Sequence, residues 1–533
     1  MIQKILIRYH TLKYLKPVQI YYRLFYFIRK RIYHPNFDFS AKNQVKGYPL
    51  SFFNFQSAFP TLSSDMKFCF LNKEYTFKEN VDWNFKNYGK LWTYNLNYFD
   101  YLLQTGLDKK QGLALINDYC KNIANIKDGL EPYPISLRGI NWIKFLSVNK
   151  ITDTAIEYCL YLQYKQLEKN LEYHLLANHL LENAFSLLFA AYYFQDEAYY
   201  QKAKKILHKE LNEQILDDGA HFELSPMYHQ ILLQRLLDAI NLVQNNPWKS
   251  NELNGFMISK ASLMLAWLKT MSWQNALFPL FNDAANGIAP GTSELMEYAA
   301  QLSIKTEAIK LNESGYRKFS SSKFEMIVDV GKIGPSYQPG HAHADTFNFE
   351  LFANGKQIIV DTGTSTYEAG KQRLLERGTS AHNTVEMNGL NQSQIWASHR
   401  VGKRAKVKIL EDIEKKCLAV HDGYKNIGIF HQRTFIQQNE SKISIEDQIK
   451  GYNQYYTAIA RIHLHPEVEY TIENKTFCLN NSIKIIFENA EDINVCNYFY
   501  APEFNKLIEA KCIEVKFKSS LKTIIDFETI IYN

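Results

Sequence analysis

Residues 306–323 read TEAIKLNESGYRKFSSSK and separate two kinds of sequence. The segment is polar, which is typical of a connection between domains. Before it, apolar residues recur at the spacing of helices, and after it they alternate as in strands. The sequence therefore predicts a helical domain followed by a β domain, with this segment as the linker.

The helical part runs from about residue 97 to residue 305. Its apolar segments follow one another with short polar breaks, as in TDTAIEYCLYLQYKQLEKNLEYHLL, HLLENAFSLLFAAYYF and MYHQILLQRLLDAINLVQ. Short breaks favour antiparallel neighbouring helices, as in a toroid of helical hairpins. We therefore predict an incomplete (α/α) toroid over residues 86–310.

The second part, residues 320–533, consists of short alternating segments such as FEMIVDV, FNFELFA, KISIEDQI and SIKIIFEN. Gly, Asn and Asp turns separate them. This pattern is typical of an antiparallel β-sandwich. The predicted fold class is accordingly a multidomain α and β protein, with the toroid first and the sandwich second.

Residues 1–85 form a lead-in that begins with a basic segment, MIQKILIRYHTLKYLKPVQIYYRLFYFIRKRIYH. Arg, Lys or His interrupts its apolar residues every few positions. No apolar stretch reaches the roughly 7 to 15 residues of a signal-peptide core or the about 20 of a membrane span. We expect amphipathic helices that pack on the body, with peripheral contact to an anionic membrane as the alternative. The expected location is the cytoplasm, with the periplasm as the alternative.

The composition excludes several classes of protein. Hydrophobic residues make up 46% and charged residues 22% of the 533 residues, as in soluble globular proteins of two or three domains. The net charge of +6 permits a polyanionic partner, but the basic residues are scattered, which argues against nucleic acid. The seven cysteines contain no CxxC pair, which argues against a disulfide scaffold.

A first polar cluster, Ala-Asn-His-Leu-Leu-Glu-Asn at residues 177–183, opens an apolar helix. Asn178 could be a helix cap, because Asn is a preferred capping residue. His179 and Glu182 add polar groups to a helix that otherwise favours burial, so they need partners or a substrate. Upstream, Trp142 in EPYPISLRGINWIKFL is an aromatic candidate for stacking on a sugar ring.

A second cluster lies about fifty residues later, in GAHFELSPMYH at residues 219–229. Ser-Pro is an ordinary helix start, and Tyr228 could be a core aromatic with a satisfied hydroxyl. Glu223 and His229 nevertheless make the segment dense in groups that exchange protons or hydrogen bonds. We therefore treat it as a candidate substrate site.

A third cluster, GHAHAD at residues 340–345, precedes a strand. His341 and His343 point to the same side of an extended segment, because side-chain direction repeats every two residues. Such a pair is either a zinc half-site or an accident. Asp361 and His382, on neighbouring predicted strands, would complete three protein ligands and leave a position for water.

The order and spacing of several segments resemble the heparinase II/III family of bacterial polysaccharide lyases and its alginate lyase-like relatives. The segments that carry the resemblance are LWTYNLNYFDYLL, EPYPISLRGINWIKFL, NHLLENAFSLLFAAYYF, GAHFELSPMYHQILL, GHAHADTFNFEL, IIVDTGTSTY and HNTVEMNGLNQSQIW. The resemblance implies a helical toroid followed by a β-sandwich. It also implies cleavage of an acidic polysaccharide by β-elimination, without an organic cofactor.

The resemblance also implies roles for individual residues. Asn178 matches the group that neutralises the uronate carboxylate, Tyr228 matches an acid or base, and His341 matches a histidine that shares proton transfer. His179 flanks the neutralising group, as Glu182 does.

The same resemblance implies one structural zinc ion. His343, Asp361 and His382 match positions that bind it in some members, whereas in others the position of His382 belongs to the active site. Ala342 stands where members often carry Gly.

The chemistry of β-elimination agrees with these roles. The C5 proton of a uronate is weakly acidic, so its removal needs a neutralised carboxylate, a base and an acid for the leaving oxygen. We expect Tyr228 to be the acid and His341 the base or its partner, with the order depending on the stereochemistry of the substrate. Two alternatives remain: a glycoside hydrolase that uses Glu182 and Glu223, and a non-catalytic protein that binds an acidic polysaccharide of a capsule or O-antigen pathway.

Overall fold

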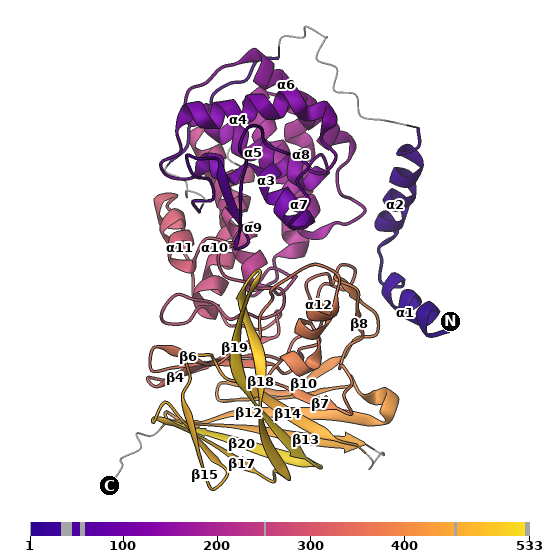
Figure 1. Ribbon diagram of the computed structural model, residues 1–533, viewed down its shortest axis with the longest axis vertical. Helices are drawn as coiled ribbons and strands as arrows, with labels where there is room; N and C mark the ends of the chain where they lie inside the picture. Colours follow the sequence, from indigo (N-terminus) through magenta and orange to yellow (C-terminus); the bar gives the residue numbers. More distant parts are fainter. Residues whose placement is uncertain (1, 33–44, 54–58, 250–251, 452–455, 528–533) are drawn as a thin grey trace.

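The computed structural model describes residues 2–32, 45–53, 59–249, 252–451 and 456–527. A helical domain is followed by a domain of antiparallel sheets, and the two stack along the long axis of the molecule (Figure 1). The predicted order of helical toroid and β-sandwich is thereby confirmed.

The helical domain is built around helices that are buried on all sides. Every residue of α7 except His179 and Phe194 is buried, which places this helix in the interior of the domain. The helices of the domain are α3 (Lys90–Tyr98), α4 (Lys109–Asn122), α5 (Pro132–Val148), α6 (Thr154–Lys169), α7 (Ala177–Phe194), α8 (Glu197–Gln214), α9 (Pro226–Asn245), α10 (Glu252–Met271) and α11 (Thr292–Gln301). A small hairpin of β1 (Lys67–Phe70) and β2 (Lys73–Thr76) precedes them.

The second domain packs one long sheet against two shorter ones. The long sheet has the order β10-β11-β12-β13-β20-β17-β16-β15, and the shorter sheets have the orders β18-β19-β14-β7 and β3-β4-β5-β6. The two shorter sheets meet at an isolated bridge between Ile359 and Leu464. Apolar residues of all three sheets form one shared core, as in a sandwich.

The strands of the sandwich have the following bounds. They are β3 (Tyr316–Ser320), β4 (Phe324–Asp329), β5 (Phe349–Ala353), β6 (Lys356–Ile359), β7 (Val385–Met387), β10 (Val407–Ile413), β11 (Lys416–His421), β12 (Ile429–Asn439), β13 (Lys442–Gly451), β14 (Ala458–His463), β15 (Tyr470–Glu473), β16 (Thr476–Leu479), β17 (Ile483–Glu488), β18 (Asp492–Glu503), β19 (Lys506–Phe517) and β20 (Ser520–Asp526). Helix α12 (Lys371–Glu376) and the short pair β8 (Ile395–Trp396) and β9 (Arg400–Val401) lie in its long loops.

Strand β3 lies inside the segment that the sequence predicts as a linker, so the β domain begins before residue 320. Tyr316 and Phe319 are buried in the strand. The polar residues that suggested a linker are held by partners: Arg317 Nε lies 2.9 Å from Asp412, and Lys318 Nζ lies 2.7 Å from Glu325. Charged residues that have partners in the folded protein are compatible with an ordered strand.

Two helices at the beginning of the chain, α1 (Ile2–Leu12) and α2 (Pro17–Arg29), lie along one side of the molecule (Figure 1). They contact both domains. Tyr26 donates to the backbone oxygen of Leu171, 2.5 Å away in the helical domain, and Trp396 of the sandwich donates to Thr11 at 3.0 Å. No helix among the described residues has the length and apolarity that crossing a membrane requires.

The two large domains are fixed to each other by hydrogen bonds close to their junction. The Tyr316 hydroxyl donates to the backbone oxygen of Leu224 at 2.6 Å, and the His343 backbone N–H donates to the side-chain oxygen of Asn282 at 3.0 Å. The tip of the β18–β19 hairpin reaches the helical domain, where Asn72 Nδ2 lies 3.0 Å from Glu503 Oε2. These contacts define the walls of a cleft.

Candidate active site

A cleft of about 1490 Å³ lies between the helical domain, the sandwich and α2. All four residues that the sequence predicts as catalytic line it: Asn178, His179, Tyr228 and His341. Three of them come from the first turns of helices and one from a loop of the sandwich. Side chains that are up to 163 residues apart in the sequence (341 minus 178) therefore meet at one wall.

Asn178 is the second residue of α7 and faces the cleft although it is only 4% exposed. The helix begins at Ala177 after Leu176, and the structure finds no side-chain cap, so the interpretation of Asn178 as a cap is wrong. Leu176 and Ala177 have φ angles of 62° and 54°, a region that L-residues rarely adopt. Such strain is typical of functional sites. Here it places the Asn178 amide at the cleft.

Tyr228 lies in the first turn of α9, which begins after Ser225 as the Ser-Pro pair predicts. Its hydroxyl lies 3.3 Å from that of Tyr367, and its ring lies against His341 with 3.9 Å between centroids. Burial, reinforced by Tyr367, raises the pKa of Tyr228 well above its ordinary value. Tyr228 is therefore protonated at neutral pH and can act as an acid.

His341 lies in the loop between β4 and β5 and is oriented by two carboxylates. Its Nδ1 lies 2.9 Å from Asp283 Oδ2, and its Nε2 lies 3.7 Å from Glu223 Oε2. A ring that donates through Nδ1 to Asp283 keeps a lone pair on Nε2. His341 can then accept a proton from a substrate in the cleft.

Asp283, which no sequence pattern indicated, organises this part of the site. Arg373 binds its two oxygens at 2.5 and 2.6 Å, and His343 Nε2 lies 2.8 Å from Oδ1. Burial alone would raise the pKa of Asp283, but Arg373 and the two histidines lower it well below the usual range. A permanent carboxylate therefore holds His341 and His343 in place.

His179 is held at the edge of the cleft by Glu172. Its Nδ1 lies 3.0 Å from Glu172 Oε1, and its ring lies 4.9 Å from that of Tyr133. Burial would lower the pKa of His179, but the Glu172 carboxylate outweighs it and the pKa is raised. A partly protonated His179 adds positive charge next to Asn178.

The prediction that Glu182 binds substrate directly is corrected by the structure. Glu182 lies one helical turn after Asn178 but is covered by Arg235, whose Nε is 3.1 Å from Glu182 Oε1. Burial raises the pKa of Glu182 to about 7, against the opposing effect of Arg235. Arg235 lines the cleft and Glu182 does not. Glu182 thus acts on the cleft only through Arg235.

Glu223 is also buried, and it does not line the main cleft. One of its oxygens accepts the Asn178 backbone N–H at 3.4 Å, and the other faces His341. Burial raises its pKa, against the opposing effect of His341. The prediction of direct substrate contact is therefore corrected: Glu223 connects two residues of the site.

His229 and Trp142, both predicted to bind substrate, lie in the core. His229 Nε2 bonds to the backbone oxygen of Met264 at 2.9 Å, and burial lowers the pKa of His229 to about 3. Trp142 is fully buried, with its ring 5.4 Å from Phe99 and 5.7 Å from Tyr119. Neither side chain can reach a polysaccharide, because apolar and aromatic neighbours surround both.

The three predicted zinc ligands are fully buried beside the site. His382 Nδ1 lies 2.7 Å from Asp361 Oδ2, and the rings of His343 and His382 are 5.3 Å apart. Among the described residues, His343 Nδ1 and His382 Nε2 have no hydrogen-bond partner. Asp345 Oδ2 is likewise buried and unpaired within the described chain. Two imidazole nitrogens and a carboxylate oxygen of this kind are chemically suited to zinc.

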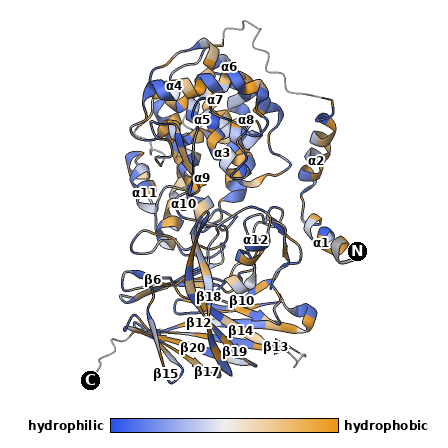
Figure 2. Cartoon of the chain, in the orientation of Figure 1, coloured by the Kyte–Doolittle hydropathy of each residue, from blue (hydrophilic) through white to orange (hydrophobic). Residues whose placement is uncertain are grey.

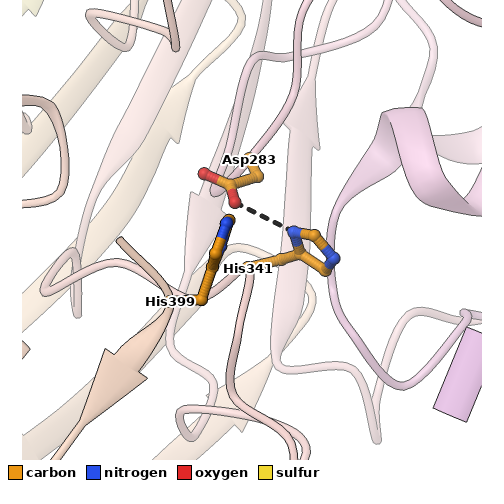
Figure 3. Close-up of side chains that lie close together, drawn as sticks. All are labelled: Asp283, His341 and His399. Atoms are coloured by element: carbon orange, nitrogen blue, oxygen red, sulfur yellow. Dashed lines mark hydrogen bonds and ion pairs between the residues drawn. The ribbon is translucent and has the colours of Figure 1, made fainter. Parts of the chain in front are cut away.

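A second group converges more closely. In the part of the chain that the structure describes, Asp283, His341 and His399 place one ligand atom each within 4.8 Å of one another, and no other group of three does so (Figure 3). Arg373 already neutralises the Asp283 carboxylate. A cation bound by Asp283, His341 and His399 would have to displace the Arg373 guanidinium or be repelled by its positive charge.

Two family models match the chain in succession. The heparinase II/III N-terminal model matches residues 135–308, and the heparinase II/III-like C-terminal model matches residues 304–528. The chain belongs to the heparinase II/III family. The boundary between the two models falls at the junction that the polar segment 306–323 marks in the sequence.

Curated relatives and solved structures agree with this assignment. Heparin-sulfate lyases from Bacteroides stercoris and Pedobacter heparinus are 26% and 25% identical to the chain over 307 and 305 residues, 51% of it in both cases. The chain covers 44% of the length of each relative.

The crystal structure of a heparinase III aligns with a TM-score of 0.65 at 17% identity, covering 85% of this chain and 80% of that one. A heparan sulfate lyase from Pedobacter heparinus aligns with a TM-score of 0.55 at 16% identity, covering 87% and 81%. At this identity the structural likeness concerns the fold.

Proposed function

We propose that the protein is a polysaccharide lyase that cleaves a uronate-containing acidic polysaccharide by β-elimination. The observation that carries the proposal is the meeting of Asn178, Tyr228 and His341 at one wall of the cleft, with the Tyr228 ring 3.9 Å from that of His341. An amide donor, a protonated phenol and an oriented imidazole are the groups that elimination requires.

The proposed reaction uses each group once. The Asn178 amide donates to the uronate carboxylate, which delocalises the charge that develops when C5 loses its proton. His341 Nε2 takes this proton, because Asp283 holds Nδ1 in the donating form. Tyr228 gives its proton to the glycosidic oxygen as the C4–O bond breaks, and a C4–C5 double bond remains. Both protein groups then return to their starting forms by exchange with water.

We propose a structural role, and no catalytic role, for a zinc ion in this protein. His343 and His382 would hold it through their unpaired nitrogens, with Asp361 or Asp345 as the carboxylate. Asp283 and Asp361 bond to the opposite ring nitrogens and so favour the required tautomers. When bound, the ion would stabilise the loop that carries His341 rather than activate water.

Two alternatives are less well supported. A glycoside hydrolase needs two carboxylates that flank the substrate bond, but the candidates Glu182 and Glu223 are buried outside the main cleft. A protein that only binds polysaccharide would have no use for a Tyr228 that contacts an imidazole fixed by a carboxylate.

The direct test is the ultraviolet absorbance of the conjugated double bond during incubation with a panel of uronate polysaccharides. The panel includes heparan-like glycosaminoglycans, alginate and bacterial capsular or O-antigen polymers. Rising absorbance that the variant Tyr228→Phe lowers by about 10²- to 10⁴-fold is the expected result. The variant Tyr94→Phe is the matched control, since its hydroxyl also lines the cleft but bonds to Glu131 instead.

The outcomes separate the alternatives. New reducing ends without absorbance would indicate a hydrolase. Binding of a polysaccharide without either signal would indicate the non-catalytic alternative. Full activity of Tyr228→Phe with rising absorbance would leave the lyase in place but would remove Tyr228 as its acid.

A further inference from the structure

Helix α2 exposes its apolar face to solvent, whereas a surface helix of a globular protein usually exposes its polar face. Its inner side carries Gln19, Tyr22, Arg23, Tyr26 and Arg29, which are buried or half-buried against the body. Their contacts are polar and aromatic: Gln19 Nε2 donates to the backbone oxygen of Leu175 at 3.1 Å, and the Tyr22 ring stacks on that of Tyr173 with 4.7 Å between centroids. The polar face of this amphipathic helix is therefore the one that docks on the protein.

The outer side of α2 is apolar. Ile20, Leu24 and Ile28 stand one turn apart and are 55%, 60% and 49% exposed. Tyr21, Phe25 and Ile32 widen this stripe, and Ile5, Leu6, Tyr9 and Leu12 are exposed apolar residues of α1. Figure 2 shows the apolar residues along both helices, which stand at the edge of the molecule. A contiguous exposed apolar surface of this kind marks an interaction site.

The charge of the segment indicates what covers this surface. Residues 1–37 contain eight Lys or Arg residues and no Asp or Glu. Arg8, Lys13 and Arg31 are exposed at the border of the stripe. A second copy of the chain would bring these cations face to face, whereas anionic lipid headgroups complement them. Tyr9 and Tyr21 add the amphipathic rings that favour the boundary between headgroups and acyl chains.

We propose that the outer face of α1 and α2, defined by Ile5, Leu6, Tyr9, Leu12, Ile20, Tyr21, Leu24, Phe25, Ile28 and Ile32, docks the protein on an anionic lipid bilayer. The helices lie in the plane of the interface with the apolar stripe inserted and the basic residues at the headgroups. They remain attached to the body through their polar inner face.

Docking through this face determines where the cleft lies relative to the membrane. Arg23, Tyr26 and Arg29 line it from the inner side of α2, opposite the outer stripe. The cleft therefore lies directly behind the docked helix. If the proposed lyase activity holds, a polysaccharide attached at the membrane surface is within its reach, but docking itself does not depend on that activity.

The test measures co-sedimentation of the full chain with vesicles of phosphatidylcholine alone or mixed with phosphatidylglycerol. We expect binding to the mixed vesicles, weakened by salt, because screening reduces attraction between exposed charges. The triple variant Ile20→Ser, Leu24→Ser and Ile28→Ser should bind at least about tenfold more weakly, equal to about 1.4 kcal/mol. None of these three side chains lines the cleft.

The matched control removes three equally exposed apolar side chains from the sandwich: Ile413→Ser, Ile472→Ser and Leu507→Ser. Their exposed fractions are 57%, 52% and 44%, so the change in surface hydrophobicity is comparable. The control should bind vesicles as the unaltered protein does. Thermal unfolding of both variants should match that of the unaltered protein, because the replaced side chains are exposed.

Three results would overturn the proposal. The protein could fail to bind the mixed vesicles, or the α2 variant and its control could bind equally well. Alternatively, the unaltered chain could form a dimer that the α2 variant abolishes, which would assign the stripe to a second copy. All three measurements are made without a polysaccharide, so their failure is distinct from a failure of the lyase proposal.

Discussion

His341 and His343 are two residues apart and bond to the two oxygens of one carboxylate, yet only His341 reaches the cleft. His341 Nδ1 lies 2.9 Å from Asp283 Oδ2, and His343 Nε2 lies 2.8 Å from Oδ1. The His341 side chain is 15% exposed, whereas that of His343 is 0% exposed. Access, and not the choice of partner, thus separates a residue that can meet a substrate from one that can only support the structure.

The two rings also differ in the nitrogen that they leave for another partner. The Nε2 atom of His341 lies 3.7 Å from Glu223 Oε2. The Nδ1 atom of His343 is buried and has no hydrogen-bond partner among the described residues. Burial, against the opposing effect of Asp283, lowers the pKa of His343 to about 4. A neutral, buried imidazole with a lone pair suits a metal better than a proton transfer.

The largest difference is expected when each histidine is tested for turnover. His341→Ala should lower the rate of β-elimination by about 10²- to 10⁴-fold, because a general base is lost. Its free energy of unfolding should change less than that of His343→Ala, because the His341 side chain is partly exposed at the cleft and that of His343 is not. His465→Ala, a half-buried histidine outside the cleft, is the control and should keep full turnover. An active His341→Ala variant would contradict the difference drawn between the two histidines.

Arg373 should affect both histidines through Asp283. The guanidinium is fully buried and binds both carboxylate oxygens. Arg373→Met leaves a buried carboxylate with less compensation and should lower the free energy of unfolding by roughly 3–5 kcal/mol. Denaturant unfolding measures this loss. Adding Asp283→Asn to the same chain should recover part of it, and a double variant that is no more stable would contradict the role of the charge.

Local patterns predicted the parts of the site that depend on neighbouring residues. Ser225-Pro226 does begin the helix that carries Tyr228, and His341 and His343 do face one partner. Asp283 was missed because its partners lie 58 or more residues away in another domain. The sequence signal for it is no more than an Asn-Asp pair after the apolar run FPLF.

The wrong predictions of site residues have a common physical cause. Sequence periodicity shows which residues share one face of a helix, but it does not show which side chains of other elements cover that face. Glu182 shares a helix face with Asn178, yet Arg235 of another helix lies over it. Trp142 was predicted to stack on a sugar ring of the substrate, but aromatic side chains surround it in the core. Amphipathic helices were correctly predicted for the basic segment at the beginning of the chain. The sequence also predicts that these helices pack on the body, and they do; the face through which α2 packs, its polar face, was not predicted.

A role of His343 in metal binding can be distinguished from that of a buried histidine that contributes only to packing. His343→Ala should lower the free energy of unfolding by about 1–3 kcal/mol, because Asp283 loses a buried donor. It should also lower the zinc content measured by elemental analysis, since bound metal stabilises the fold. His463→Ala is the control: this histidine is equally buried, but it bonds to Asn383 and should affect stability alone. Absence of zinc from the unaltered protein would exclude a structural role for the metal.

His179 is a third histidine bonded to a carboxylate, and its effect should be the smallest. Burial lowers its pKa, but Glu172 outweighs it and the pKa is raised, so the folded protein binds the proton more tightly than the unfolded chain. The resulting stability is fully present below about pH 6.5, the unfolded value, and is lost as the pH rises through the folded pKa.

His179→Gln should therefore reduce the free energy of unfolding more at about pH 5.5 than at about pH 9, where the histidine is neutral in both states. The difference should stay below about 1 kcal/mol, because the side chain is 32% exposed and solvent screens the pair. Denaturant unfolding at the two pH values measures it. Equal losses at both values would mean that Glu172 orients His179 by a neutral hydrogen bond, as expected for a histidine that shapes the cleft without adding charge to it.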